Sequence, residues 1–236
     1  MKTYKIHIIR HGITQANLDG QYAGHGDYPL CEQGKNQLEQ MVADYEYPES
    51  DALFCSPLTR CIETAKIIYP EKKPIIINEL IEYNFGEFEG RTADELRSDE
   101  LFVKWLSGDA DAAPPFGESN RHFGTRVCSA FTKLVDGLIK TGTTSASLVI
   151  HGGVIMALMN CFAVPELPMT SWLVPNGCGY TICITPSLWS RLQKFEVMQE
   201  LPVIDDEDFH EGAISSAREK LKNANYGFFN VVHREE

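Results

Sequence analysis

The stretch Ile8-Ile9-Arg10-His11-Gly12-Ile13-Thr14-Gln15-Ala16-Asn17 lies close to the N-terminus of the chain. The alternating run over residues 4–9 predicts a buried strand that ends in Arg10 and His11 at a glycine turn. The carboxyl edge of an open α/β sheet is where ligands bind. An arginine at this edge offers several N–H donors to a phosphate, and a histidine can act as a nucleophile or a base at about pH 7. The alternative is a polar strand end with two solvated side chains.

A second strand end repeats this chemistry. Residues 147–150 predict a strand that ends at His151-Gly152-Gly153, and residues 154–162 predict a helix directly after it. If both strands are central and parallel, His11 and His151 emerge on the same edge of the sheet. The glycines allow backbone N–H groups to approach an anion closely, and the helix N-terminus adds a partial positive charge.

Strand and helix patterns alternate along the rest of the chain. Helices are predicted over residues 34–45, 58–68, 92–106 and 119–140, strands over residues 51–55, 74–77, 178–184 and 192–198, and a loop over residues 18–30. This alternation predicts an α/β fold, a three-layer α/β/α sandwich with a mostly parallel central sheet. Residues 1–200 are predicted to form one domain and residues 201–236 a C-terminal helical extension. The extension is expected to dock on the same domain, and joining a partner subunit in a homodimer is the alternative.

The composition excludes several classes of partner. A formal charge of -12, from 33 acidic and 21 basic residues, argues against nucleic acid and anionic membranes but not against a small anionic substrate. No apolar run approaches the roughly 20 residues that span a bilayer, and the N-terminus does not resemble a signal peptide. The seven cysteines form no Cys-x-x-Cys pair, so we expect reduced core residues of a cytoplasmic protein, with no metal or cofactor.

Several motifs together give the chain a family resemblance. In chain order they are Arg10-His11-Gly12 with Thr14 and Asn17, residues 24–34, residues 56–65, Glu82 ahead of residues 85–90, Gly117-Glu118-Ser119, and His151-Gly152-Gly153-Val154. In this order and spacing they resemble the histidine phosphatase superfamily, also called the phosphoglycerate-mutase-like family, over roughly residues 4–198. The resemblance implies the phosphoglycerate-mutase-like fold and phosphoryl transfer without a metal or cofactor.

The resemblance also implies a role for individual residues. His11 is expected to be the nucleophile that forms a phosphohistidine, Glu82 the general acid and base, and His151 a further catalytic residue. The residues expected to bind the phosphoryl group are Arg10, Asn17, Arg60 and Gly152. The residues expected at the rim of the substrate pocket are Ile13, Tyr22, Ala23 and Gly24. Charge repulsion from the two arginines would favour neutral His11, and burial would raise the pKa of Glu82.

Some of these residues have a plain structural alternative. Arg60 could pair with Glu63 or Glu82 on the surface. Other acidic residues of the same segment compete with Glu82 for the acid–base role, namely Glu79, Glu87 and Glu89. His25 is expected to be a solvated loop residue, and His7 a core residue.

The segment after Glu82 favours a phosphatase over a phosphoglycerate mutase. A mutase must hold a substrate carboxylate with additional basic residues, whereas residues 91–118 contain three basic and seven acidic residues. Water is therefore the expected acceptor, and the substrate is expected to be a small phosphorylated metabolite with some apolar or aromatic body. Cofactor-dependent mutase activity and a catalytically weak phospho-ligand-binding role remain the alternatives.

Overall fold

The computed structural model describes residues 2–203, and their centre is a seven-stranded sheet with the order β3-β2-β4-β1-β6-β7-β5. The strands are β1 (Tyr4–Arg10), β2 (Ala52–Cys55), β3 (Ile75–Ile76), β4 (Ser145–Ile150), β5 (Ala163–Val164), β6 (Gly179–Ile184) and β7 (Phe195–Leu201). Neighbours from β3 to β1 are parallel, as are β7 and β5, but β6 runs antiparallel to both of its neighbours. The sheet is therefore mixed, and its larger parallel part carries both predicted strand ends.

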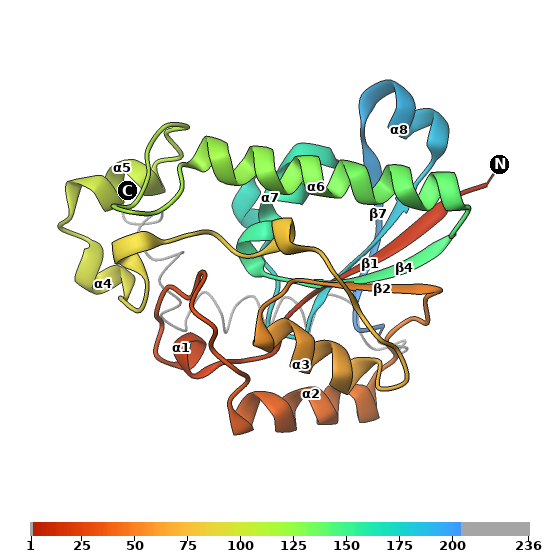
Figure 1. Cartoon of the computed structure of the whole chain (residues 1–236), viewed down its shortest axis with the longest axis horizontal. Coiled ribbons are helices and arrows are strands. Elements are labelled where there is room, and N and C mark those ends of the chain that lie inside the picture. The colour runs from red at the N-terminus through yellow and green to blue at the C-terminus, as the bar shows by residue number, and fades with distance from the viewer. Residues whose placement is uncertain (1, 204–236) are drawn as a thin grey trace.

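Helices cover both faces of the sheet (Figure 1). One face carries α6 (Asn120–Thr141) and α7 (Gly152–Phe162), and the other carries α2 (Glu32–Asp44) and α3 (Thr59–Ile68). Shorter helices are α1 (Gln15–Leu18), α4 (Ala93–Leu96), α5 (Glu100–Leu106) and α8 (Pro186–Leu192), with 3-10 turns η1 (Asn78–Leu80), η2 (Gly86–Phe88) and η3 (Met169–Trp172). Each face buries its own apolar cluster. The predicted three-layer α/β/α sandwich is confirmed.

The long helix α6 follows directly from its sequence. Apolar residues recur at every third or fourth position from Phe123 to Leu138, and all of them are buried. The Ser119 hydroxyl accepts the N–H of His122 and caps the N-terminus. Gly142 adopts a left-handed backbone conformation and ends the helix. The polar face of α6, which carries Arg126, is thereby fixed relative to the sheet.

The register of β1 and β4 brings the two strand ends together. Arg10 lies opposite Ile150 in this parallel pair, so the next residue of each strand, His11 and His151, leaves the sheet at the same level. The His11 N–H donates to the Ile150 carbonyl at 2.9 Å and continues the ladder by one bond.

The predicted strand over residues 192–198 is wrong at its start. Helix α8 occupies Pro186–Leu192, and β7 begins only at Phe195. Pro186 stands in the first turn of α8, where its missing N–H costs no helical hydrogen bond. Gln193 ends α8 in a left-handed backbone conformation.

The predicted helix over residues 92–106 is divided into α4 and α5. The Asp99 side chain accepts the N–H groups of Leu101 and Phe102, and so caps a new helix in the middle of the predicted one. The capping box of Thr92 and Glu95 is present as predicted.

The cysteines agree with the prediction only in part. Cys55, Cys61 and Cys183 are buried, but Cys161 is exposed and the other three are half-buried. An apolar sequence neighbourhood did not guarantee burial, because Cys161 occupies the outer side of α7 near its end.

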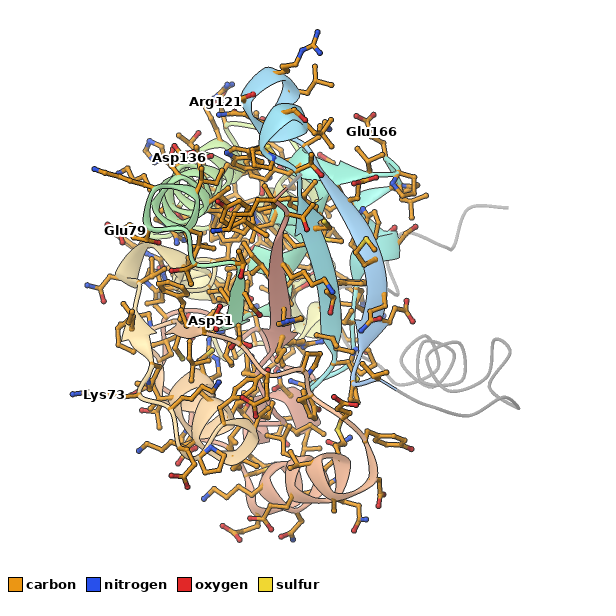
Figure 2. All side chains as sticks on the ribbon, turned by 90° about the vertical axis from the view of Figure 1, so that its right-hand side faces the viewer. Asp51, Lys73, Glu79, Arg121, Asp136 and Glu166 are labelled. Carbon is orange, nitrogen blue, oxygen red and sulfur yellow. The ribbon has the colours of Figure 1, made fainter. Side chains whose placement is uncertain are left out.

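The outer surface is rich in charged side chains, and Lys73 and Glu166, for example, point outward (Figure 2). Within residues 2–203, no helix has the length and apolar character needed to cross a bilayer. The predicted C-terminal extension lies, apart from its first three residues, outside the described part of the chain. Its helix and its docking remain predictions.

Candidate active site

His11 is buried at the end of β1, and its hydrogen bond fixes its tautomer. Its Nδ1 lies 2.7 Å from the Gly12 carbonyl oxygen, which can only accept. In the neutral ring Nδ1 therefore carries the proton, and Nε2 keeps its lone pair. Burial, together with the charges of Arg60 and Arg10, holds the pKa of His11 well below its usual value. The ring is thus neutral, with its lone pair on one defined nitrogen.

His151 lies beside His11, with ring centroids 5.2 Å apart. Both of its nitrogens have protein partners: Nδ1 accepts from Arg60 Nε at 3.2 Å, and Nε2 donates to the Ser56 hydroxyl at 2.6 Å. Burial and the neighbouring Arg60 lower the pKa of His151 well below its usual value. The predicted meeting of the two histidines is present in the structure, and a role of His151 on the phosphoryl group remains a prediction.

Arg60 is completely buried in the first turn of α3, so a surface ion pair with Glu63 or Glu82 is wrong for this side chain. Besides His151, its guanidinium donates to the carbonyl oxygens of Gly24 and Gly26 at 2.7 and 2.8 Å. Arg60 therefore holds the loop over residues 23–26 from the protein interior. Its predicted contact with a phosphoryl group is not tested by these bonds.

Glu89 holds the same loop through the opposite set of backbone groups. Its carboxylate accepts the N–H groups of Gly24, His25 and Gly26 at 2.8 to 3.1 Å. Arg60 donates to carbonyl oxygens of this loop, and Glu89 accepts its N–H groups. The two side chains thus provide hydrogen-bond partners for a loop that has no regular secondary structure. Glu89 was a predicted alternative to Glu82 for the acid–base role. In the structure its carboxylate binds the main chain of this loop instead.

Glu82 lies between η1 and η2, and it alone of the four acidic candidates of its segment lines the cavity that His11 also lines. Its side chain is buried, with Oε1 accepting the Tyr83 N–H at 2.8 Å and Oε2 accepting the Gly153 N–H at 3.0 Å. Burial raises the pKa of Glu82, although these two bonds and the nearby Arg60 and Arg10 act in the opposite direction. A carboxyl group with a raised pKa is suited to donate and accept protons.

Gly153 gives the Glu82 carboxylate its room. A Cβ atom at this position would lie 2.5 Å from Glu82 Oε1. We expect Gly153→Ala to displace the carboxylate and to lower the hydrolysis rate about tenfold or more, because small misplacements of reacting groups are costly. Steady-state kinetics would measure this. Gly124→Ala, on α6 with open space around its Cβ, is the matched control, and equal activity of the two variants would contradict the expectation.

Asn17 lines the same cavity as His11, and Asn176 lies against the main chain of His11. The Asn17 side-chain oxygen accepts the Thr14 N–H at 3.1 Å, so its amide nitrogen is the donor that remains for a ligand. Asn176 donates to the carbonyl oxygens of His11 and Gly12 at 2.9 and 3.2 Å. Sequence analysis missed Asn176, and its only signal was the turn sequence Pro175-Asn176-Gly177.

Arg10 and Gly152 line the polar end of the same cavity. Arg10 donates through Nη1 to the Val174 carbonyl oxygen at 2.8 Å, which orients its guanidinium. Gly152 begins α7, and a Cβ there would lie 3.3 Å from Arg10 Nε. Glycine therefore keeps the helix N-terminus close to the arginine, and both residues line the cavity.

The cavity has a volume of about 210 Å³, and its wall beyond the polar end is mainly aromatic and apolar. The residues that make this wall are Tyr22, Tyr83, Phe85, Trp105, Leu106, Phe123, Met156, Met169 and Leu173. Of the predicted rim residues, Tyr22 and Ala23 line the cavity. Ile13 is buried next to Gly34 instead, and Gly24 is packed against the Tyr83 carbonyl oxygen. Most of the wall comes from residues that the sequence did not assign to the site, namely Tyr83, Trp105, Leu106, Phe123, Met156, Met169 and Leu173.

No metal site is apparent beside this constellation. Within residues 2–203, no group of three or more His, Cys, Asp or Glu side chains is arranged to hold a metal ion. The titratable and charged groups among the predicted catalytic and phosphate-binding residues that line the cavity are the imidazole of His11, the buried carboxyl group of Glu82 and the guanidinium of Arg10.

This combination of fold and site has known relatives. Residues 6–195 match the family model of the histidine phosphatase superfamily, branch 1. The chain belongs to this superfamily, and the predicted membership in a family of phosphatases is confirmed.

Individual relatives carry two kinds of name. An adenosylcobalamin/alpha-ribazole phosphatase of Escherichia coli is 30% identical over 202 residues, which cover 84% of this chain and 95% of the relative. A 2,3-bisphosphoglycerate-dependent phosphoglycerate mutase of Cytophaga hutchinsonii is 29% identical over 159 residues, covering 64% and 74% of the two chains. The crystal structure of an alpha-ribazole phosphatase from Shigella flexneri aligns with a TM-score of 0.71 at 26% identity, covering 86% and 100%.

Proposed function

We propose that the protein is a metal-independent phosphomonoesterase that forms a phosphohistidine on His11. In the first step, His11 Nε2 attacks phosphorus and the bond to the leaving oxygen breaks, while Glu82 donates a proton to that oxygen. In the second step, the water oxygen attacks phosphorus and gives a proton to Glu82, while the bond from phosphorus to His11 Nε2 breaks, so that phosphate is released and neutral His11 is restored. The observation that carries the proposal is that His11, with a defined tautomer, and the buried carboxyl group of Glu82 line one cavity.

The remaining polar residues are proposed to bind the phosphoryl group. Arg10, the Asn17 amide nitrogen and the Gly152 N–H belong to residues that line the same cavity as His11, and they can present donors to an anion. Arg60 and His151 are proposed to join this set, with their present protein contacts adjusting when a phosphoryl group binds. Stabilising charge and fixing the in-line geometry account for most of the catalysis of phosphoryl transfer, so a set of donors can serve where other enzymes use a metal.

The cavity favours a hydrolase over a mutase. Of the described residues that line it, Arg10 is the only lysine or arginine, so a substrate carboxylate would have no second cation opposite it. The aromatic wall instead suits a phosphate monoester with an apolar or aromatic body. The names of the relatives include both alpha-ribazole phosphatase and phosphoglycerate mutase, so both activities belong in the test. The proposed location is the cytoplasm, in keeping with seven free thiols.

A matched pair of esters tests this proposal. We expect 2-phenylethyl phosphate to be hydrolysed with a kcat/KM roughly tenfold to hundredfold above that of ethyl phosphate, because burial of the ring stabilises the bound state. Released phosphate is measured in the presence of a chelator, with alpha-ribazole phosphate in the same panel and 3-phosphoglycerate isomerisation followed in parallel. Equal kcat/KM values for the two esters, or isomerisation faster than phosphate release, would contradict the proposal.

A further inference from the structure

The backbone that carries Glu82 has no sheet or helix to hold it. Residues 81–85 lie between the turns η1 and η2, so their carbonyl groups lack the regular partners of secondary structure. The Glu82 carboxylate is itself well anchored, but its position depends on the main chain behind it. Buried carbonyl groups need donors, and here the donors come from elsewhere in the chain.

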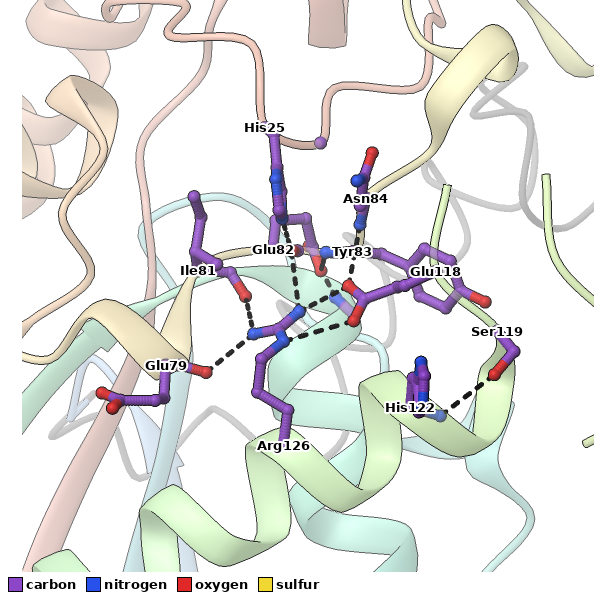
Figure 3. Close-up of polar contacts among 12 residues, drawn as sticks. His25, Glu79, Ile81, Glu82, Tyr83, Asn84, Glu118, Ser119, His122 and Arg126 are labelled. Atoms are coloured by element: carbon purple, nitrogen blue, oxygen red, sulfur yellow. Dashed lines mark hydrogen bonds and ion pairs between the residues drawn. The ribbon is translucent and has the colours of Figure 1, made fainter. Parts of the chain in front are cut away.

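Arg126 on α6 donates to the main chain of this segment and of η1 before it (Figure 3). Its Nη1 donates to the carbonyl oxygens of Glu79 and Ile81 at 2.7 and 2.9 Å, and its Nη2 donates to that of Glu82 at 3.2 Å. One side chain therefore holds three carbonyl groups within four residues. A lysine could not reproduce this arrangement, because it lacks the planar fork of donors.

Glu118 occupies the remaining donors of the same guanidinium. It accepts from Arg126 Nε at 3.2 Å and from Nη2, so all five N–H groups of Arg126 have acceptors. Glu118 Oε1 also accepts the Asn84 N–H at 2.9 Å and so holds the chain on the other side of Glu82. The ion pair is largely buried, with side-chain exposures of 22% for Arg126 and 14% for Glu118. The cluster thus fixes the segment over residues 79–84 with no net charge.

A second group meets the Glu82 carbonyl from the opposite direction. His25 Nε2 donates to this oxygen at 3.0 Å, from the loop that Arg60 and Glu89 hold (Figure 3). The Glu82 main chain is therefore fixed between α6 and the loop. His25 was expected to be a solvated loop residue, and it is exposed, but its ring makes this contact.

We propose that Arg126 is a positioning residue for the general acid, acting through the Glu82 backbone with Glu118 as its counter-ion. This inference rests on the proposed function, since it assigns Arg126 to the proton-transfer step of that reaction. Arg126 does not contact the substrate cavity, and it acts on catalysis only by holding the main chain of Glu82. The charges that act on the Glu82 pKa are those of Arg60 and Arg10.

The dependence of the rate on the leaving group tests this role. Expulsion of p-nitrophenolate needs little help from an acid, whereas expulsion of an alkoxide depends on it. We expect Arg126→Gln to lower kcat/KM for 2-phenylethyl phosphate about tenfold or more beyond any loss for p-nitrophenyl phosphate. A loss of packing or stability would lower the two values equally. Arg126→Lys, which keeps the charge but not the fork, is expected to show the same selective loss to a smaller extent.

Arg121→Gln is the matched control. Arg121 lies on the same helix and points outward (Figure 2). It pairs with Asp111, but both side chains of this pair are exposed. This variant is expected to stay within about twofold of the unmodified protein for both esters. Should Arg126→Gln fail to fold, Arg126→Lys and Glu118→Gln carry the same comparison. Equal losses for the two esters, or no loss, overturn the positioning role, whereas an unmodified protein that hydrolyses neither ester overturns the proposed function.

Discussion

Replacing His11 with alanine is expected to lower phosphate release by about 10⁴-fold or more, because no other side chain can take the phosphoryl group at this position. The His11 lone pair sits on Nε2, and neighbouring His151 has both nitrogens engaged by Arg60 and Ser56. Because Nδ1 of His151 accepts from Arg60, its Nε2 carries the proton and has no lone pair, so we do not expect His151 to replace the lost nucleophile. The rate is measured with p-nitrophenyl phosphate, for which leaving-group departure is easiest.

His122 offers the control for the His11 variant. It is exposed on α6, with its backbone N–H on the Ser119 cap, and His122→Ala is expected to keep the full rate. A circular dichroism melt checks that His11→Ala is folded. If His11→Ala keeps a tenth of the activity, the activation free energy has risen by only about 1.4 kcal/mol. Such a small loss would show that His11 is not the nucleophile.

Glu82→Gln is expected to produce the second largest loss, about 10² to 10⁴-fold for an alkyl phosphate. The amide cannot donate a proton as a carboxyl group does, and it also brings an NH₂ group against the N–H of Tyr83 or Gly153, which the carboxylate now accepts. Glu87→Gln is the control, because Glu87 lies in the same segment but is exposed.

The pH profile separates these two residues. The raised pKa of Glu82 keeps its proton to higher pH, so the acid is present below that pKa and is lost as pH rises through it. The lowered pKa of His11 keeps the nucleophile neutral as pH falls through its usual value of about 6.5. We therefore expect kcat/KM for an alkyl ester to fall on the alkaline side and to show no His11 limb at about pH 6.5. In Glu82→Gln the alkaline fall should vanish, and its persistence would contradict the assignment of Glu82.

The sequence was sufficient to predict the meeting of His11 and His151. Both follow buried strands at a glycine, and parallel strands end at one edge, so a short-range pattern determined a long-range contact. In the structure Arg10 pairs with Ile150, and this register of β1 and β4 places His11 and His151 at the same level. The loop over residues 18–30 was likewise predictable from its glycine, aspartate and proline content.

The support behind the site was not predictable in the same way. Arg126 lies 44 residues after Glu82, and Asn176 lies 165 residues after His11. Such contacts depend on how α6 and the 174–178 turn are placed in three dimensions, and no local periodicity encodes them. Arg60 is a second example. Its guanidinium donates to carbonyl oxygens of the loop over residues 23–26, and these bonds can be recognised only in the folded structure.

The central claim is that phosphorus becomes bonded to His11, and a trapping experiment tests it directly. Glu82→Gln is mixed with p-nitrophenyl phosphate, whose leaving group departs without an acid, so the phosphoenzyme should accumulate because no base activates water. The reaction is stopped, and the protein is analysed by intact mass and by peptide mapping under conditions that preserve phosphohistidine. The account predicts one acid-labile phosphoryl group per chain, on His11 and absent from the His11→Ala, Glu82→Gln double variant. A burst of p-nitrophenol with no phosphoryl group on the protein, or with the group on another residue, would contradict it.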